Sequence, residues 1–220
     1  MVQKRRSGRK TPAAPAPQTS RTAQRRERER QARHDLICDA ATRVFARHGY
    51  GASSMEQVAQ EAALGKATLY YYFRTKRELF GAILSREHVA LAELSRQHLD
   101  AGADALATAR AICLHWVSHF EAHPDLATLM LPIMASGMSR LKAELGDEVA
   151  TQVRAAHQPL MAALATLSPS RQRGPALTSL ISTLVLGLVA RAAGGQSQGA
   201  AHDIEMFFDL VEPALARTRK

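Results

Sequence analysis

The stretch "SMEQVAQEAALGKATLYYYF", residues 54–73, decides the fold because it holds two short helical patterns around a four-residue break. Ser54 followed by Gln57 three residues later is a capping box, which predicts that a helix begins here. The break "AALG" at 62–65 separates this helix from the second pattern. Small residues around the break allow the two helices to cross closely. The sequence therefore predicts a helix-turn-helix unit over residues 55–74.

The second pattern ends in three adjacent tyrosines, in a chain that is only 5% aromatic. Successive side chains on a helix point about 100° apart, so three neighbours cannot all face one core. If Leu69 and Phe73 turn inward, the outward face carries Lys66, Thr68, Tyr70 and Tyr71. Side chains of these types bind phosphates and base edges, and the face has no carboxylate. The second helix is therefore expected to recognise DNA; the alternative is an aromatic cluster within the core.

The rest of the chain is expected to be helical. Apolar residues recur at helical spacing nearly throughout, and no long alternation of the kind typical of strands occurs. We predict an all-α fold of about nine helices, with a break near Gly146. Besides the two short helices, the expected helices cover residues 33–49, 76–99, 103–122, 125–136, 139–167, 175–193 and 202–218.

The net charge of +9 lies entirely at the N-terminus. Residues 1–33 hold 11 Lys and Arg against 2 Asp and Glu, whereas residues 34–220 hold 18 of each kind. We expect residues 1–32 to form a disordered basic arm, since this segment has too little apolar surface to fold alone. The arm is either a solubilising tail or an arm that binds a polyanion such as nucleic acid.

The remaining composition indicates a cytoplasmic protein. Cys38 and Cys113 are the only two cysteines and form no paired motif, so a reducing compartment is expected. The basic N-terminus lacks the apolar region of a secretory signal. The longest apolar stretch, residues 176–190, is too short and too interrupted by hydroxyl side chains to span a membrane.

The segment "DAATRVFARHGYGASSMEQVAQEAALGKATLYYYFRTKRELF", residues 39–80, resembles the N-terminal domain of the tetracycline-repressor (TetR) family of bacterial transcriptional regulators. The resemblance extends over about residues 33–85. It implies a DNA-binding domain at 33–80 and a C-terminal regulatory and dimerisation domain at 81–220. The C-terminal part matches the family only in the number and size of its helices.

The resemblance also implies which residues contact DNA. Ser54 would place its hydroxyl on a phosphate, Tyr72 would reach a flanking phosphate, and Lys76 would clamp the backbone. The start of the recognition helix would enter the major groove. The full implied set is Ser54, Gly65, Lys66, Ala67, Thr68, Tyr70, Tyr71, Tyr72 and Lys76.

The turn departs from the family pattern, since Ala63 stands where glycine is usual and Gly65 where serine is usual. Alanine in a left-handed conformation costs on the order of 1 kcal/mol. Either the turn geometry shifts, or Ala63 stays helical and Gly65 adopts the special dihedral. The contacts at positions 65 and 67 are the ones that this departure affects most.

A dimer interface and a ligand pocket are expected in the C-terminal part. The alternative for both sets of residues is ordinary core, because apolar residues at helical spacing usually pack inside a protein. The interface candidates are Leu177, Leu180, Ile181, Leu184, Val185, Leu188, Phe207, Phe208 and Val211. The pocket candidates are Trp116, His119, Phe120, Met130, Met134, His157 and Met161.

His115, His119 and His123 stand at i, i+4 and i+8, a spacing at which two histidines can share zinc. No carboxylate or cysteine nearby in the sequence completes a ligand set, so we predict neither a metal, a cofactor nor an enzymatic activity. The predicted function is a homodimeric regulator that binds a palindromic operator and is released by a small molecule of unknown identity. The alternatives are an activator of the same fold, or a nonspecific DNA-binding protein that acts through the basic arm.

Overall fold

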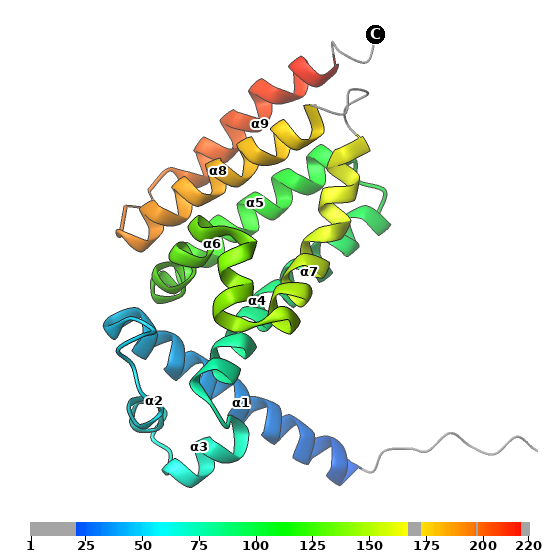
Figure 1. Cartoon of the computed structure of the whole chain (residues 1–220). Coiled ribbons are helices and arrows are strands. Elements are labelled where there is room, and N and C mark those ends of the chain that lie inside the picture. The colour runs from blue at the N-terminus through cyan, green and yellow to red at the C-terminus, as the bar shows by residue number, and fades with distance from the viewer. Residues whose placement is uncertain (1–20, 167–172, 197, 217–220) are drawn as a thin grey trace, which may run out of the picture. The chain divides into compact units, whose positions relative to one another are not determined.

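The computed structural model describes residues 21–166, 173–196 and 198–216, and all regular elements within these ranges are α-helices (Figure 1). The all-α prediction is confirmed. No helix among these residues is long and apolar enough to cross a membrane. The chain divides into two units, Met1–Asp35 and Leu36–Lys220.

The first unit is described from Arg21 on, where helix α1 (Arg21–His48) begins. Residues 21–32 are thus helical, whereas the sequence led us to expect an arm without structure up to residue 32. The helix is held here by pairs one turn apart: Arg25 with Glu29 at 3.1 Å and Arg30 with Glu27 at 2.7 Å. Such exposed pairs stabilise a helix by a few tenths of a kcal/mol each. The rest of the expected arm lies outside the described residues.

The second unit begins with a compact group of short helices. Ile37, Ala41 and Phe45 on α1 are buried and belong to the same apolar cluster as residues of α2 (Met55–Glu61) and α3 (Lys66–Tyr72). Thr75 caps the next helix, α4 (Lys76–Asp100), by accepting a hydrogen bond from the Glu78 backbone N–H at 3.0 Å. The helices α2, α3 and α4 fall close to their predicted bounds because their signals, caps and apolar spacing, are local in the sequence.

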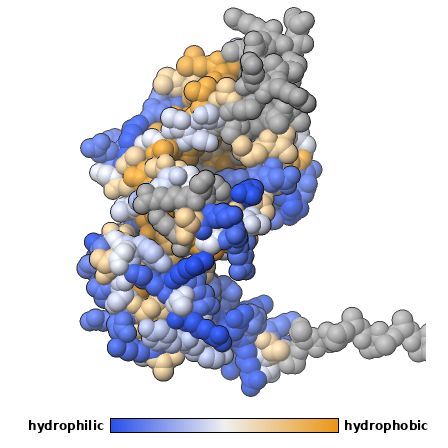
Figure 2. Space-filling model, viewed as in Figure 1, coloured by the Kyte–Doolittle hydropathy of each residue, from blue (hydrophilic) through white to orange (hydrophobic). Residues whose placement is uncertain are grey.

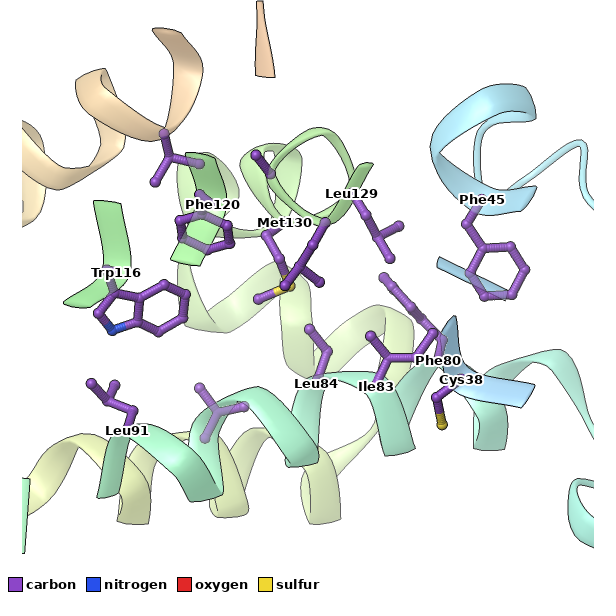
Figure 3. Packing of buried hydrophobic residues seen from close by; sticks show 14 of the residues in the cluster. Cys38, Phe45, Phe80, Ile83, Leu84, Leu91, Trp116, Phe120, Leu129 and Met130 are labelled. Carbon is purple, nitrogen blue, oxygen red and sulfur yellow. The ribbon is translucent and has the colours of Figure 1, made fainter. Parts of the chain in front are cut away.

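Five further helices form the rest of this unit: α5 (Ala105–Ala122), α6 (Pro124–Leu145), α7 (Asp147–Thr166), α8 (Arg173–Ala193) and α9 (Ala200–Ala216). Helix α4 packs chiefly against α7, and both α8 and α9 pack on α5. The buried apolar cluster is continuous along α4: it runs from Phe45 and Phe80 to Leu91 and Trp116 (Figure 3). The short helices and the larger helical body thus share one core.

Helix α6 contains the break that the sequence predicts after residue 136: Gly137, with φ of 74° and ψ of 174°, is not helical. The second predicted break lies at Gly146, with φ of 91°, a conformation that favours glycine. Arg77 of α4 contacts this break by donating from Nε to the Leu145 carbonyl at 3.1 Å. The first turn of α4 is therefore joined to the connection between α6 and α7.

Candidate functional site

The helix-turn-helix begins with the capping box that the sequence predicts. Ser54 Oγ accepts from the Gln57 backbone N–H at 3.2 Å, and Gln57 Oε1 accepts from the Ser54 backbone N–H at 2.8 Å. Arg43 and Arg47 of α1 bind both carboxylate oxygens of Glu61, at 2.7 and 2.8 Å, and so attach α2 to α1. These two pairs could not be predicted, since their partners lie 14 and 18 residues apart.

Ala63 is the strained residue of the turn. Its φ is 53°, and no other non-glycine residue among those described has positive φ. Gly65 is extended, with φ of −67° and ψ of 146°. The second alternative considered above, with Ala63 helical and Gly65 in the special conformation, is therefore wrong. The left-handed residue allows the Leu64 N–H to reach the Ala59 carbonyl at 2.9 Å, which closes the end of α2.

The recognition helix α3 has the two faces expected of it. Leu69 is fully buried and Phe73 is 2% exposed, whereas Tyr71 is 79% exposed. Tyr70 is also exposed, and Tyr72 is half-buried with its ring against the edge of Tyr71 at 5.3 Å. The other outward residues of the predicted set are exposed as well: Gly65, Lys66, Ala67 and Thr68. The structure thus brings hydroxyls and a cation together on one solvent-facing surface.

One carboxylate approaches this surface, which the sequence did not indicate. Glu56 of α2 lies 3.4 Å from the Lys66 ammonium. A backbone hydrogen bond and the charge of Lys66 lower the pKa of Glu56, so it is ionised near neutral pH. A phosphate that binds Lys66 must compete with this exposed ion pair.

Lys76 makes contacts that the family resemblance did not imply. Its ammonium donates to the carbonyl oxygens of Tyr50, Gly51 and Ser53 at 2.6, 3.1 and 2.7 Å. It also lies 4.7 Å from the centre of the Tyr50 ring. An ammonium has three protons, and all three are directed at these carbonyls. In this structure Lys76 therefore fastens the loop between α1 and α2 to the start of α4, and its contact with a DNA phosphate stays a prediction.

A cavity of about 430 Å³ lies among α4 to α8. Five of the pocket candidates line it: Trp116, Met130, Met134, His157 and Met161. Phe120 does not, since it is fully buried behind Trp116, with ring centres 4.7 Å apart. His88 and Leu91 of α4 also line the cavity, although the sequence suggested only that this helix connects the two domains.

His119, the remaining candidate, faces Glu87 instead of the cavity. Its Nε2 lies 2.7 Å from Glu87 Oε2, and Arg86 contacts the other oxygen of that carboxylate at 3.2 Å. Burial alone would raise the pKa of Glu87, but His119 and Arg86 hold it below its usual value. A carboxylate from α4 therefore does reach the histidine row, which its neighbours in the sequence had not indicated. Among the described residues, no group of His, Cys, Asp or Glu has the arrangement of a metal site.

The interface candidates on α8 and α9 divide between two faces. Ile181, Val185, Leu188 and Phe208 are buried and belong to the core, which is the alternative that the sequence left open for them. Leu184, Phe207 and Val211 are half-buried, and Leu180 is 57% exposed. The side chain of Leu177 lies outside the described residues. The face also includes Met206 and Leu210, which is 71% exposed, and apolar side chains gather over these helices (Figure 2).

Comparison with known proteins identifies the helix-turn-helix region. A family model described as "Bacterial regulatory proteins, tetR family" matches residues 37–83. Residues 37–83 thus form a tetR-family domain. Among curated relatives, it is 45% identical over 53 residues to the uncharacterized HTH-type transcriptional regulator YhgD of Bacillus subtilis, a match that covers 24% of this chain and 28% of that protein. It is 29% identical over 128 residues to the HTH-type transcriptional repressor SCO4008 of Streptomyces coelicolor, covering 57% and 60%.

Solved TetR-family structures support the fold beyond this domain. A TetR family regulator of Marinobacter aquaeolei is similar with a TM-score of 0.66 at 19% identity, over 83% of this chain and 95% of that one. FadR of Bacillus subtilis in complex with stearoyl-CoA has a TM-score of 0.65 at 16% identity, over 80% and 95%. The sequence matches to the two curated relatives above span only 28% and 60% of the length of those proteins. The helix-turn-helix region is therefore the part of this chain that sequence comparison identifies as TetR-like.

Proposed function

We propose that this TetR-family chain is a homodimeric, sequence-specific transcriptional regulator, and that it is a repressor released from a palindromic operator by a small molecule. The observation that carries the proposal is the outward face of α3, where Lys66, Thr68, Tyr70 and Tyr71 are exposed above a buried Leu69. A helix with this face fits the major groove. Residues 33–80 would act as the DNA-binding domain and 81–220 as the regulatory and dimerisation domain, in the cytoplasm.

The dimer would form through the apolar face of α8 and α9. One recognition helix reads few bases, and a dimer reads two half-sites about 34–36 Å apart. Leu180, Met206 and Leu210 are each at least half exposed, which supports a face that a second copy covers. The cavity beside this face would bind the effector, and its size lies within the range of about 300–1,000 Å³ usual for small-molecule sites.

The central test selects bound duplexes from a random pool and measures the affinity of variants by fluorescence anisotropy. Tyr71→Ala should weaken operator binding by about 1–3 kcal/mol for each lost contact and leave helix content unchanged. Val89→Ala, on an exposed side chain of α4, is the matched control and should bind as the unaltered protein does. Equal operator affinity for Tyr71→Ala and Val89→Ala would contradict the proposed contact face.

A second measurement separates phosphate contact from base contact. Lys66→Met should reduce the slope of log affinity against log salt by about one per protomer and weaken binding to all duplexes alike. Lys142→Met, an exposed lysine of α6, serves as the control. An unchanged slope for Lys66→Met would mean that this ammonium stays with Glu56 and does not bind phosphate.

Activation remains the second candidate because one relative is an activator by name: the HTH-type transcriptional activator FasR of Mycolicibacterium smegmatis, 37% identical over 70 residues. Transcription from the selected operator in vitro decides between the two, since a repressor lowers transcript yield and an activator raises it. The nonspecific alternative depends on the basic arm. The test is a variant without residues 1–20. If this variant keeps its sequence preference in competition with random DNA, the nonspecific alternative is excluded.

A further inference from the structure

The cavity is mainly apolar, and its walls include Leu91, Ile112 and Met130. No Lys, Arg, Asp or Glu is among its described lining residues. The polar side chains among these residues are two histidines, Trp116 with its indole N–H, and the hydroxyl residues of α8. The histidines are the ones whose charge and hydrogen-bonding role depend on their protonation state.

His88 is held in one defined tautomer. Its Nδ1 lies 2.7 Å from the Leu84 carbonyl oxygen, one turn earlier on α4. A carbonyl can only accept, so Nδ1 carries the proton. Burial lowers the pKa of His88, although the Leu84 carbonyl and the Glu87 carboxylate oppose this effect. The ring is therefore neutral near pH 7, and its Nε2 has a lone pair that can only accept a hydrogen bond.

The second histidine is also neutral. The rings of His157 on α7 and His88 lie 5.2 Å apart, edge to face. Burial, together with the charge that a protonated His88 would add, lowers the pKa of His157 to about 4. The carboxylate of Glu87 also acts on His88, and its negative charge is already held by His119 and Arg86. An anionic ligand would thus find no cation among the described lining residues.

The accepting nitrogen of His88 has no donor within the described part of the protein. The recorded contacts of this ring are the Leu84 carbonyl and the rings of Trp116 and His157. No sealed side-chain nitrogen or oxygen among the described residues lacks a partner, so Nε2 is open to a space beside the ring. His88 lines the cavity, beside the single tryptophan of the chain, and it also borders a second hollow with Ser85 and Val89.

We propose that the cavity binds an uncharged, mainly apolar molecule with one hydroxyl group, such as a phenol or an alcohol, whose O–H donates to His88 Nε2. This inference rests on the proposed function, because it takes the cavity as the effector site. A ligand without the donor leaves the acceptor buried and unpaired, and an anion gives up its hydration where no described lining residue carries a positive charge. Both kinds of ligand should bind more weakly, because contact with the apolar walls does not compensate for an unpaired polar group or a desolvated charge.

Three probes of nearly equal shape test this chemistry by isothermal titration calorimetry on the full chain at neutral pH: para-propylphenol, its methyl ether, and para-propylbenzoate. The phenol should bind roughly tenfold or more tightly than the ether, because the ether cannot donate to the buried nitrogen. The benzoate should bind more weakly than the phenol. Equal affinity of phenol and ether, or tightest binding of the benzoate, would overturn the proposal.

Two histidine variants locate the acceptor. His88→Leu should remove the preference for phenol over ether. His98→Leu is the matched control. Like His88, His98 lies on α4 and places its Nδ1 near the carbonyl oxygen four residues earlier, that of Leu94, at 2.9 Å. It does not line the cavity. The control should keep the preference. If His88→Leu keeps it too, the assignment to His88 is wrong; the comparison of probes on the unaltered protein decides the proposal even if the variant does not fold.

The calorimetry contains no DNA, so it separates this inference from the function on which it rests. If the phenol is preferred but does not change operator affinity, the ligand chemistry stands and release by this class of effector fails. If the operator is bound and none of the three probes binds at millimolar concentration, the present inference is wrong while the DNA-binding function stands.

Discussion

Replacing Ala63 by glycine should stabilise the protein, although the substitution only removes atoms. Ala63 has φ of 53° in the turn of the helix-turn-helix. A Cβ in the left-handed region costs about 1–2 kcal/mol. Glycine avoids this cost but makes the unfolded chain more flexible, which takes back about 0.4–1 kcal/mol. The side chain is exposed, so no packing is lost, and the net gain should be about 0.5–1 kcal/mol.

Thermal unfolding followed by far-UV circular dichroism measures this gain. For a protein of this size, 1 kcal/mol corresponds to a rise of about 2–4 °C in Tm. Protein concentration must be the same for all variants, since dimerisation itself raises Tm. The matched control is Ala90→Gly, at an exposed position inside α4 with helical dihedrals, where glycine should cost about 0.5–1 kcal/mol. If both glycine variants lower Tm by similar amounts, the turn is not strained and the reasoning is refuted.

Three further predictions concern the helical body and its attachments. Lys76→Met should lower the free energy of unfolding by about 2 kcal/mol, since three loop carbonyls lose their donor, whereas Lys66→Met should change it by less than about 0.5 kcal/mol; urea unfolding of both variants checks this contrast. Stability should fall by about 1–2 kcal/mol between pH 7.5 and pH 5, because the unfolded His157 takes up a proton near pH 6.5 and the folded ring does so only at about 4. His157→Phe should flatten this fall, and an unchanged pH profile in urea unfolding would count against it. Leu210→Glu should convert dimer to monomer in sedimentation velocity, and Val89→Glu, also on an exposed apolar residue, should not.

The helix-turn-helix could be predicted because its signals are local. The capping box at Ser54 and Gln57, the spacing from Val58 to Leu69, and the tyrosine run each involve residues close together in the chain. Lys76 could not be assigned in this way. Its partners lie 23 to 26 residues earlier, so the sequence shows a lysine at a position matching the family pattern but not what its ammonium binds.

For the helical body, the sequence predicted which segments form helices, but not which way the apolar side chains of each helix face. Apolar spacing on α8 identified residues that must be covered, but not which of them face the core and which the surface: Ile181 is buried and Leu180, its neighbour, is exposed. The cavity was found in part through Trp116, Met130 and Met134, whose large side chains stand out in the sequence. His88 was missed because its importance arises from a tertiary contact with His157 and from a backbone hydrogen bond that composition does not reveal.

Because Lys76 donates hydrogen bonds to the loop from Tyr50 to Ser53, a movement at one end of α4 is passed on to this loop. The first turn of this helix cannot move without carrying the loop, and with it α2. His88, at the cavity, stands twelve residues further along, which is about 18 Å on an α-helix. A tilt of about 10° around that point would displace Lys76 by about 3 Å, close to the length of a hydrogen bond. If the cavity is the effector site, as proposed, a ligand that shifts α4 only slightly there would move the helix-turn-helix by enough to break the proposed contacts with DNA.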